Sequence, residues 1–361
     1  MTVTILGGSA PSTPWLIEAL VERNCTLTLR LAGRTTTHLA AVARACRLLA
    51  RDNAIRIESF ERNQWPAALE GADIVLIQIR EGGLEARLHD ETFPVRYGIP
   101  GDEGLGPGGL AAAIRTWPTL REIFTLVRLH APRALPLLLT SPAGLLIRAT
   151  AGEFPGWPVY AICELPFTTL ESLSPKPVSF GYTGVNHLGW LHSMEGHPDV
   201  PLKYLRLHFD RENALREPPR ASALMRIRDA AFYAFAQRDI HEIRAALDLR
   251  PAPWYTHAIA PLLAGVTTQP YFLTQPDVEG ERAYEWTGRR FVALPNPEPP
   301  AFVRDLTASF LTYEQEALPA VLNPTLQNIQ HALSAHPWAT SESAPAAFAT
   351  LTGTSFLTTH A

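Results

Sequence analysis

The sequence predicts an α/β fold: an N-terminal Rossmann-like, doubly wound parallel sheet followed by a mixed α+β domain. Over residues 1–165, short continuous apolar runs alternate with segments of helical periodicity. Such runs are typical of parallel strands buried on both faces, and their alternation with helices is typical of doubly wound sheets. A glycine turn follows the first apolar run directly, as in dinucleotide-binding folds. We therefore expect two domains, residues 1–165 and residues 166–361, which a length of 361 residues favours.

Composition and charge exclude several classes of partner. The net charge of −4 provides no excess of basic residues to bind nucleic acid, so we do not expect a nucleic-acid partner. No apolar run reaches the roughly 18 residues that span a membrane, and residues 1–6 read as a strand rather than a signal peptide. The three cysteines, an odd number at wide spacings, argue against a disulfide framework. We expect a cytoplasmic enzyme.

Residues 3–6 read as the first strand and residues 13–23 as a helix, and the turn between them has features of a dinucleotide site. Such a site needs glycine where the backbone turns tightly and a helix N-terminus directed at the phosphates. The candidate cofactor contacts are Gly7, Gly8, Ser9 and Thr13. Taken alone the motif is weak, because Ser9 and Ser12 stand where its second and third glycines fall.

The second strand, expected at residues 25–32, ends without the usual acid. NAD enzymes normally present an acid to the ribose at this point. Arg34 stands there instead and could accommodate the 2′-phosphate of NADP. Alternatively, Arg34 and Thr35 simply start the helix expected at residues 37–51, or cofactor binding has been lost.

The stretch from residue 73 to residue 117 carries the strongest pattern in the chain. After a short helix at residues 65–69, residues 73–79 read as a buried strand, residues 101–109 are dense in glycine, and a helical pattern covers residues 110–128. Open α/β sheets bind ligands at the carboxyl ends of their strands, and guanidinium groups match phosphate and carboxylate geometry. Arg80 and Arg87 follow the strand and are candidates for holding an anion. The alternative is a glycine-rich connection with solvated charges.

This stretch resembles the shared block of glycoside hydrolase family 4, the NAD- and metal-dependent glycosidases that include 6-phospho-α- and 6-phospho-β-glucosidases. The chain departs from the block at Asp102, where the family usually has Gln. The resemblance covers nearly the whole chain and implies that residues 166–361 form a substrate, metal-binding and oligomerisation domain of the type shared by lactate dehydrogenase and family 4 glycosidases. The matching residues, in order and at near-identical spacing, are Arg80, Gly82, Gly83, Arg87, Asp90, Glu91, Gly101, Glu103, Gly106, Pro107, Gly108 and Gly109.

Two residues match the metal ligands of this family. Cys163 ends the apolar run that starts at Val159, and His187 lies in an Asn-His-Leu motif. From the residues alone, a strand cysteine is usually a small buried hydrophobe and a lone histidine is usually structural. The resemblance implies that Cys163 and His187 hold a divalent ion, commonly Mn²⁺, with further positions open to substrate hydroxyls.

The resemblance also implies the remaining site residues. Glu164 matches the Asp general acid of the 6-phospho-α-glucosidases, where the β-glucosidases typically have Asn, although it could be a solvent-facing Glu without a role. Tyr255 aligns with the family's catalytic base, but Pro251 and Ala252 replace a Gly-Gly pair, and a packed surface aromatic is the alternative. Tyr233 is a weaker candidate for the base. Ser141 replaces the Asn of a Thr-Asn-Pro motif after the strand expected at residues 134–140. The implied substrate contacts are Arg87, Ser141, Asn186 and Arg250, and Arg80 is an implied cofactor contact.

The activity that the resemblance implies is hydrolysis of a 6-phosphorylated glucoside by redox-assisted elimination. NAD, or NADP, would take hydride from sugar C3, and the metal would stabilise the resulting enediolate. Tyr255 would remove the C2 proton, Glu164 would protonate the departing oxygen, and water addition and hydride return would follow. The expected partner is a sugar phosphate, and the family tends to dimers and tetramers. Two alternatives remain: a 2-hydroxy acid dehydrogenase on the same scaffold, and a degenerate sugar-phosphate or nucleotide binder without turnover.

Overall fold

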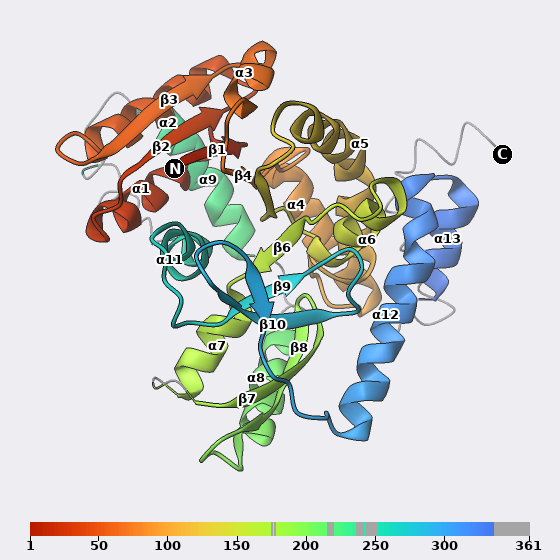
Figure 1. The fold of residues 1–361 in the computed structure, drawn as a ribbon. Helices are drawn as coiled ribbons and strands as arrows, with labels where there is room; N and C mark the ends of the chain where they lie inside the picture. The colour runs from red at the N-terminus through yellow and green to blue at the C-terminus, as the bar shows by residue number, and fades with distance from the viewer. Residues whose placement is uncertain (175, 177, 215–219, 236–241, 243–251, 336–361) are drawn as a thin grey trace.

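A nine-stranded sheet forms the centre of the structure, a computed structural model that describes residues 1–335 except 175, 177, 215–219, 236–241 and 243–251 (Figure 1). Six strands are parallel and lie in the order β3-β2-β1-β4-β5-β6. This is the strand order of a Rossmann sheet, so the predicted fold class is confirmed. The six strands are β1 (Thr2–Leu6), β2 (Leu27–Ala32), β3 (Ile55–Phe60), β4 (Ile74–Ile77), β5 (Leu135–Leu138) and β6 (Tyr160–Cys163).

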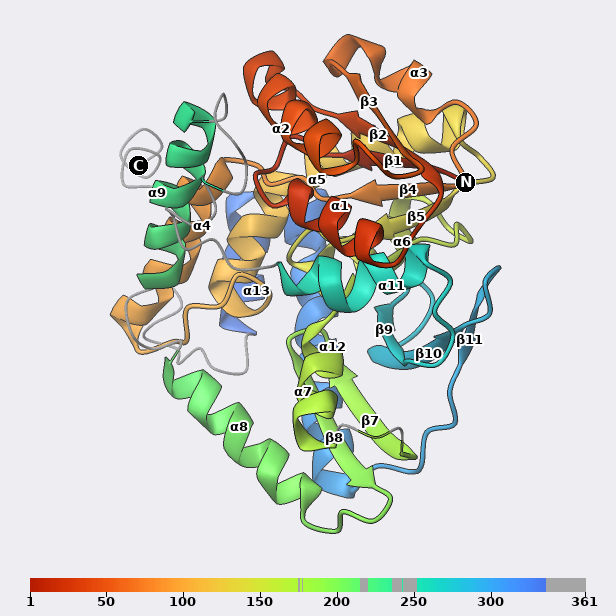
Figure 2. The same ribbon diagram turned by 90° about the vertical axis from the view of Figure 1, so that its left-hand side faces the viewer.

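Apolar runs form these strands because helices cover both faces of the sheet (Figure 2). All four residues of β4 are buried, and Ile77 lies beside Leu6 of β1 and Leu138 of β5. One face packs against α3 (Trp65–Leu69), α5 (Gly106–His130), α6 (Ala143–Glu153), α12 (Ala301–Leu322) and α13 (Leu326–Ser334). The other face packs against α1 (Thr13–Glu22), α2 (Thr36–Leu49), the π-helical η3 (Trp254–Ile259) and α11 (Ala260–Leu263).

Residues beyond 165 extend this sheet and add a separate hairpin. β9 (Tyr271–Thr274) pairs antiparallel with β6, and β10 (Glu281–Trp286) and β11 (Phe291–Ala293) follow outward. β7 (Phe180–Val185) and β8 (Leu188–Met194) form the hairpin. The mixed α+β character of this half is therefore as expected, whereas the domain boundary at residue 165 stays a prediction.

The chain after β4 differs from the expected turn. It forms a helix, α4 (Gly83–Thr92), whose N-cap Gly82 and first residue Gly83 adopt left-handed backbone conformations with φ of +73° and +62°. Glycine is favoured at such angles because it has no Cβ. α5 also begins at Gly106, earlier than the apolar pattern indicated, with Pro107 in its first turn. The remaining helices are η1 (Arg62–Gln64), α4 (Gly83–Thr92), η2 (Pro94–Tyr97), α7 (Leu165–Leu173), α8 (Val200–Ala214) and α9 (Arg220–Phe235). Within the described ranges, none of the helices is both long and apolar enough to cross a membrane.

Candidate active site

A cavity of about 950 Å³ opens where the parallel strands end. Its walls come from the segments that follow β1, β2, β4, β5 and β6, from the turn between β7 and β8, and from α9. This is the edge at which open α/β sheets bind ligands. The residues that were expected at the site and line this cavity are Gly7, Ser9, Arg34, Arg80, Arg87, Ser141, Cys163, Glu164, Asn186 and His187.

The glycine turn after β1 forms one wall. Gly7 has a φ of +91°, and a Cβ there would lie 2.7 Å from the backbone oxygen of Gln78, so glycine is required. The amides of Gly7 and Gly8 both donate to the carbonyl of Ala32 at 3.0 Å. Thr13 is fully buried, and its hydroxyl accepts a hydrogen bond from Gln78 Nε2 at 3.3 Å. Gly8 and Thr13 therefore hold the turn in place through these hydrogen bonds and are not among the residues that line the cavity.

Arg34 lies on the cavity wall just after β2. Its Nη1 is 2.6 Å from Oε1 of Glu81, a residue that follows β4. A ligand phosphate would have to compete with this carboxylate for the guanidinium. The preference for NAD or NADP stays a prediction.

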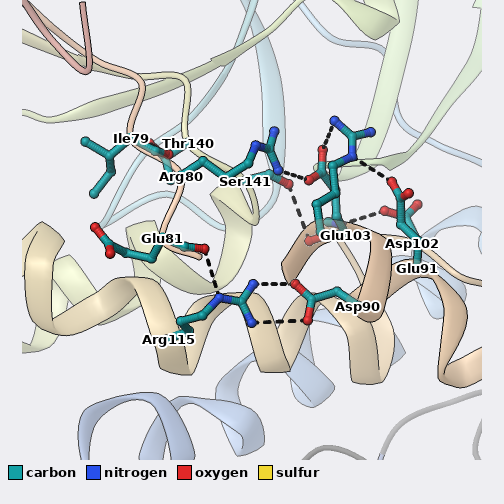
Figure 3. A network of polar contacts seen from close by, with 12 residues as sticks. Ile79, Arg80, Glu81, Asp90, Glu91, Asp102, Glu103, Arg115, Thr140 and Ser141 are labelled. Atoms are coloured by element: carbon teal, nitrogen blue, oxygen red, sulfur yellow. Dashed lines mark hydrogen bonds and ion pairs between the residues drawn. The ribbon is translucent and has the colours of Figure 1, made fainter. Parts of the chain in front are cut away.

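Glu103, in the glycine-dense loop, binds both arginines that follow β4. Arg80 pairs with one carboxylate oxygen (Figure 3), and Arg87 Nη1 lies 3.2 Å from the other. Arg87 also donates from Nε to Glu91 at 2.8 Å. Burial would raise the pKa of Glu103, but the two arginines lower it below its ordinary value. The carboxylate thus stays ionised, and both guanidinium groups are engaged.

A second ion pair ties α4 to α5. Arg115 faces Asp90 with two guanidinium nitrogens, and its Nε donates to the carbonyl of Glu81 at 3.0 Å (Figure 3). Asp90 is only 1% exposed, and burial raises its pKa despite the arginine. This pair fixes the chain between the strand end and α4, where it borders the cavity.

Cys163 and His187 meet on the cavity wall. Cys163 is the last residue of β6, and His187 lies in the turn between β7 and β8 with a φ of +67°. The thiol and the imidazole are in hydrogen-bond contact, and His187 Nδ1 lies 3.0 Å from Oδ1 of Asp102. Burial raises the pKa of the Cys163 thiol. Burial would lower the pKa of His187, but the Asp102 carboxylate holds it well above its ordinary value.

This pair of donors suits a divalent ion. Bonds of about 2.0–2.3 Å at a tetrahedral angle place a sulfur and a nitrogen ligand roughly 3.5 Å apart, which is the scale of a hydrogen bond to sulfur. Among the described residues, no three His, Cys, Asp or Glu side chains are grouped so that they could hold a metal. An ion bound by Cys163 and His187 would therefore keep coordination positions open towards the cavity.

The neighbouring polar residues are held by the surrounding structure. Asn186 is 4% exposed, and its amide donates to Glu281 Oε1 at 2.9 Å. The Tyr182 hydroxyl donates to the other oxygen of Glu281 at 2.6 Å. The Ser141 hydroxyl lies 3.4 Å from the carbonyl of Glu103. Glu164 lies between β6 and α7 and lines the cavity beside Cys163.

The structure does not bring Tyr255 to the cavity. Its side chain is fully buried, and its hydroxyl donates to the side-chain oxygen of Gln78. Burial raises the pKa of Tyr255 to about 12, which is the wrong direction for a base. Its role as base stays a prediction that this environment disfavours. Arg250 lies outside the described residues.

Helix α9 brings two further residues to the cavity. Tyr233 donates from its hydroxyl to the carbonyl of Ser9 at 2.7 Å, and its ring stacks on His38 at 3.7 Å. Asp229 lines the cavity one turn earlier, and burial raises its pKa to about 6 although Arg80 opposes the shift. Sequence reasoning did not single out Asp229. Its only signal in the sequence was that of a single acidic residue in a helix rich in alanine and aromatic residues. Such a signal does not indicate which part of the protein the helix packs against.

Comparison with known proteins agrees with this geometry. The model for the family 4 glycosyl hydrolases matches residues 2–176. This part of the chain, just under half of its length, is similar to glycosyl hydrolase family 4. The resemblance noted in the sequence is thus confirmed.

Curated relatives match over the same half of the chain. The maltose-6′-phosphate glucosidase MalH of Clostridium acetobutylicum is 29% identical over 199 residues, which are 52% of this chain and 45% of that protein. An α-galacturonidase of Thermoanaerobacterium saccharolyticum is 28% identical over 39% of this chain and 34% of its own length. The chain therefore spans less than half the length of the curated relatives it matches.

Solved structures match along almost the whole fold. The 6-phospho-β-glucosidase of Thermotoga maritima, solved with manganese, NAD⁺ and glucose-6-phosphate, superposes with a TM-score of 0.79 at 19% identity over 98% of both chains. A 6-phospho-α-glucosidase from gut microorganisms gives 0.77 at 18% identity over 97% of both chains. The malate dehydrogenase of Plasmodium falciparum gives 0.52 at 11% identity over 90% of this chain and 99% of the other. At these identities the matches show a shared fold.

Proposed function

We propose that this protein is a nicotinamide- and divalent-metal-dependent glycosidase that acts on 6-phosphorylated glucosides. One observation carries the proposal: a single cavity contains both the glycine turn of a dinucleotide site and the Cys163–His187 pair. A 2-hydroxy acid dehydrogenase would need the turn but would have no use for the pair. A glycosidase that works through transient oxidation needs both.

The relatives support the choice of cofactors and substrate. The Thermotoga maritima enzyme is named a 6-phospho-β-glucosidase and was solved with manganese, NAD⁺ and glucose-6-phosphate. The MalH relative is named a maltose-6′-phosphate glucosidase. We assign NAD, Mn²⁺ and a sugar phosphate to this chain on that basis. Loaded with them, the site would gain a hydride acceptor and a Lewis acid for the sugar C3 oxygen.

The residues of the chain then have separate tasks. Cys163 and His187 hold the ion, and Glu164, which lines the cavity beside them, donates the proton to the departing oxygen. An acid at position 164 favours an α-linked substrate. Glu103 keeps Arg80 and Arg87 in place by direct ion pairs on the same wall.

The base that removes the C2 proton is better assigned to Asp229 than to Tyr255. A general base works best when its pKa lies near the operating pH. Asp229 lines the cavity with a pKa raised to about 6, whereas Tyr255 is buried against Gln78 with a pKa of about 12. Neutralising Asp229 should therefore remove more activity than removing the Tyr255 hydroxyl.

Release of p-nitrophenol from p-nitrophenyl 6-phospho-α- and 6-phospho-β-glucosides, with NAD⁺, Mn²⁺ and a thiol reductant, tests the proposal. We expect turnover only when cofactor and metal are both present, and faster turnover of the α-anomer. Cys163→Ser should abolish it, whereas the matched control Cys25→Ser, in a half-buried cysteine that does not line the cavity, should not. Full activity of Cys163→Ser would refute the metal assignment. Turnover of a p-nitrophenyl galacturonide in place of both phosphorylated substrates would refute the substrate assignment.

A further inference from the structure

Resting on the proposed function, we propose that Asp102 is a positioning residue that fixes the tautomer and the orientation of His187 for metal binding. The contact joins residues 85 positions apart, one in the glycine-dense loop and one in the β7–β8 turn. Asp102 stands where the resemblance to family 4 implies a Gln.

Both sides of the contact are tightly held. Asp102 is 4% exposed, and its Oδ1 accepts from the amide of Gly104 at 2.6 Å as well as facing His187 Nδ1 at 3.0 Å. A Cβ on Gly104 would lie 2.5 Å from the same Nδ1, so the loop backbone lies directly against the imidazole ring. The carboxylate therefore has a fixed position relative to the ring.

The chemistry of the pair follows from its geometry. An ionised carboxylate only accepts hydrogen bonds, so Nδ1 of His187 must carry the proton in this contact. The other nitrogen, Nε2, is then the one that can bind the ion, once the metal displaces its proton. A carboxylate behind a ligating imidazole raises its basicity and fixes its orientation, and removing such a partner typically costs about 10–100-fold in metal affinity.

Mn²⁺ binding to the full-length protein, followed by electron paramagnetic resonance of the free ion, measures this role without substrate or turnover. Asp102→Asn keeps an acceptor for Nδ1 but removes the charge, and we expect about 10-fold weaker binding; Asp102→Ala removes both, and we expect up to about 100-fold. Glu85→Gln is the matched control, because it neutralises an exposed carboxylate that lines the same cavity but pairs with Arg226, and it should bind Mn²⁺ as the native protein does. Native affinity in both Asp102 variants, or an equal loss in the control, would overturn the proposal.

A measurement on the native protein keeps the test decisive if Asp102→Ala does not fold. Long-range ¹H–¹⁵N spectra of ¹⁵N-histidine-labelled protein loaded with diamagnetic Zn²⁺ report which nitrogen of His187 is protonated, with His187→Gln assigning the signal. We expect a protonated Nδ1 and a metal-bound Nε2, and the reverse would refute the role of Asp102. If the native protein bound no metal, both this inference and the proposed function would be refuted. Native protein that binds metal independently of Asp102 would refute only this inference.

Discussion

Replacing Gly104 by Ala should displace the imidazole of His187. A Cβ at this position would lie 2.5 Å from Nδ1, 2.7 Å from Cγ and 2.9 Å from Cε1. Ordinary contact begins at 3.4 Å, so ring and loop must separate by about 0.9 Å, the difference between 3.4 and 2.5 Å. Metal–ligand bonds tolerate only about 0.2 Å. We therefore expect at least a 10-fold loss of Mn²⁺ affinity, or about 1.4 kcal/mol, and a loss of about 1–3 kcal/mol in the free energy of unfolding from overpacking.

Titration with Mn²⁺ and urea unfolding of the metal-free protein measure the two effects separately. Gly152→Ala is the control: it lies in α6, and its Cβ would meet nothing closer than Leu322 Cδ1 at 3.6 Å. It should keep native metal affinity and unfold at the same or slightly higher urea concentration, because alanine suits a helix better than glycine by roughly 0.5–1 kcal/mol. If Gly104→Ala bound Mn²⁺ as tightly as the control, the placement of His187 against this loop would be wrong.

Three further changes test the charges and hydroxyls of the site. Glu103→Gln leaves two guanidinium groups without their shared carboxylate, so it should lower the free energy of unfolding by about 3–5 kcal/mol. Urea titration at pH 7 measures this loss. The control Glu298→Gln, at an exposed ion pair, should lower the free energy of unfolding by less than about 0.5 kcal/mol. Because the pKa of Glu103 is lowered in the folded protein, its contribution to stability is present above the unfolded pKa and is lost as pH falls. The free energies of unfolding of the native protein and the variant should therefore become equal in acid. A difference in stability that stays constant with pH would contradict this. Tyr255→Phe removes one buried hydrogen bond to Gln78 and should cost about 1 kcal/mol with little loss of kcat, whereas a loss above about 100-fold would restore Tyr255 as the base. Asp229→Asn should lower kcat by about 10²–10⁴-fold and remove the acidic limb near pH 6 from the rate profile, and an unchanged profile would exclude Asp229 as the base.

The sequence alone determined the parallel sheet and the glycine turn, and the family resemblance implied the Cys163–His187 pair. Buried parallel strands leave continuous apolar runs, and the order of strands and helices constrains how a doubly wound sheet is assembled. Residues that follow such strands must meet at one edge, so Arg80, Ser141 and Glu164 could be placed together before the structure was known. Local patterns carry this information because each belongs to one strand and its following turn.

Tertiary structure alone decided which partners these side chains have. The contacts of Asp102 with His187 and of Glu281 with Asn186 join residues 85 and 95 positions apart, and no local pattern encodes them. Tyr255 shows the same limit: the resemblance implied that it is the base, but the packing of η3 against α1 turned its hydroxyl towards Gln78 and away from the cavity. Side-chain direction on a helix depends on what covers each face, and long-range packing fixes that only once the whole core is assembled.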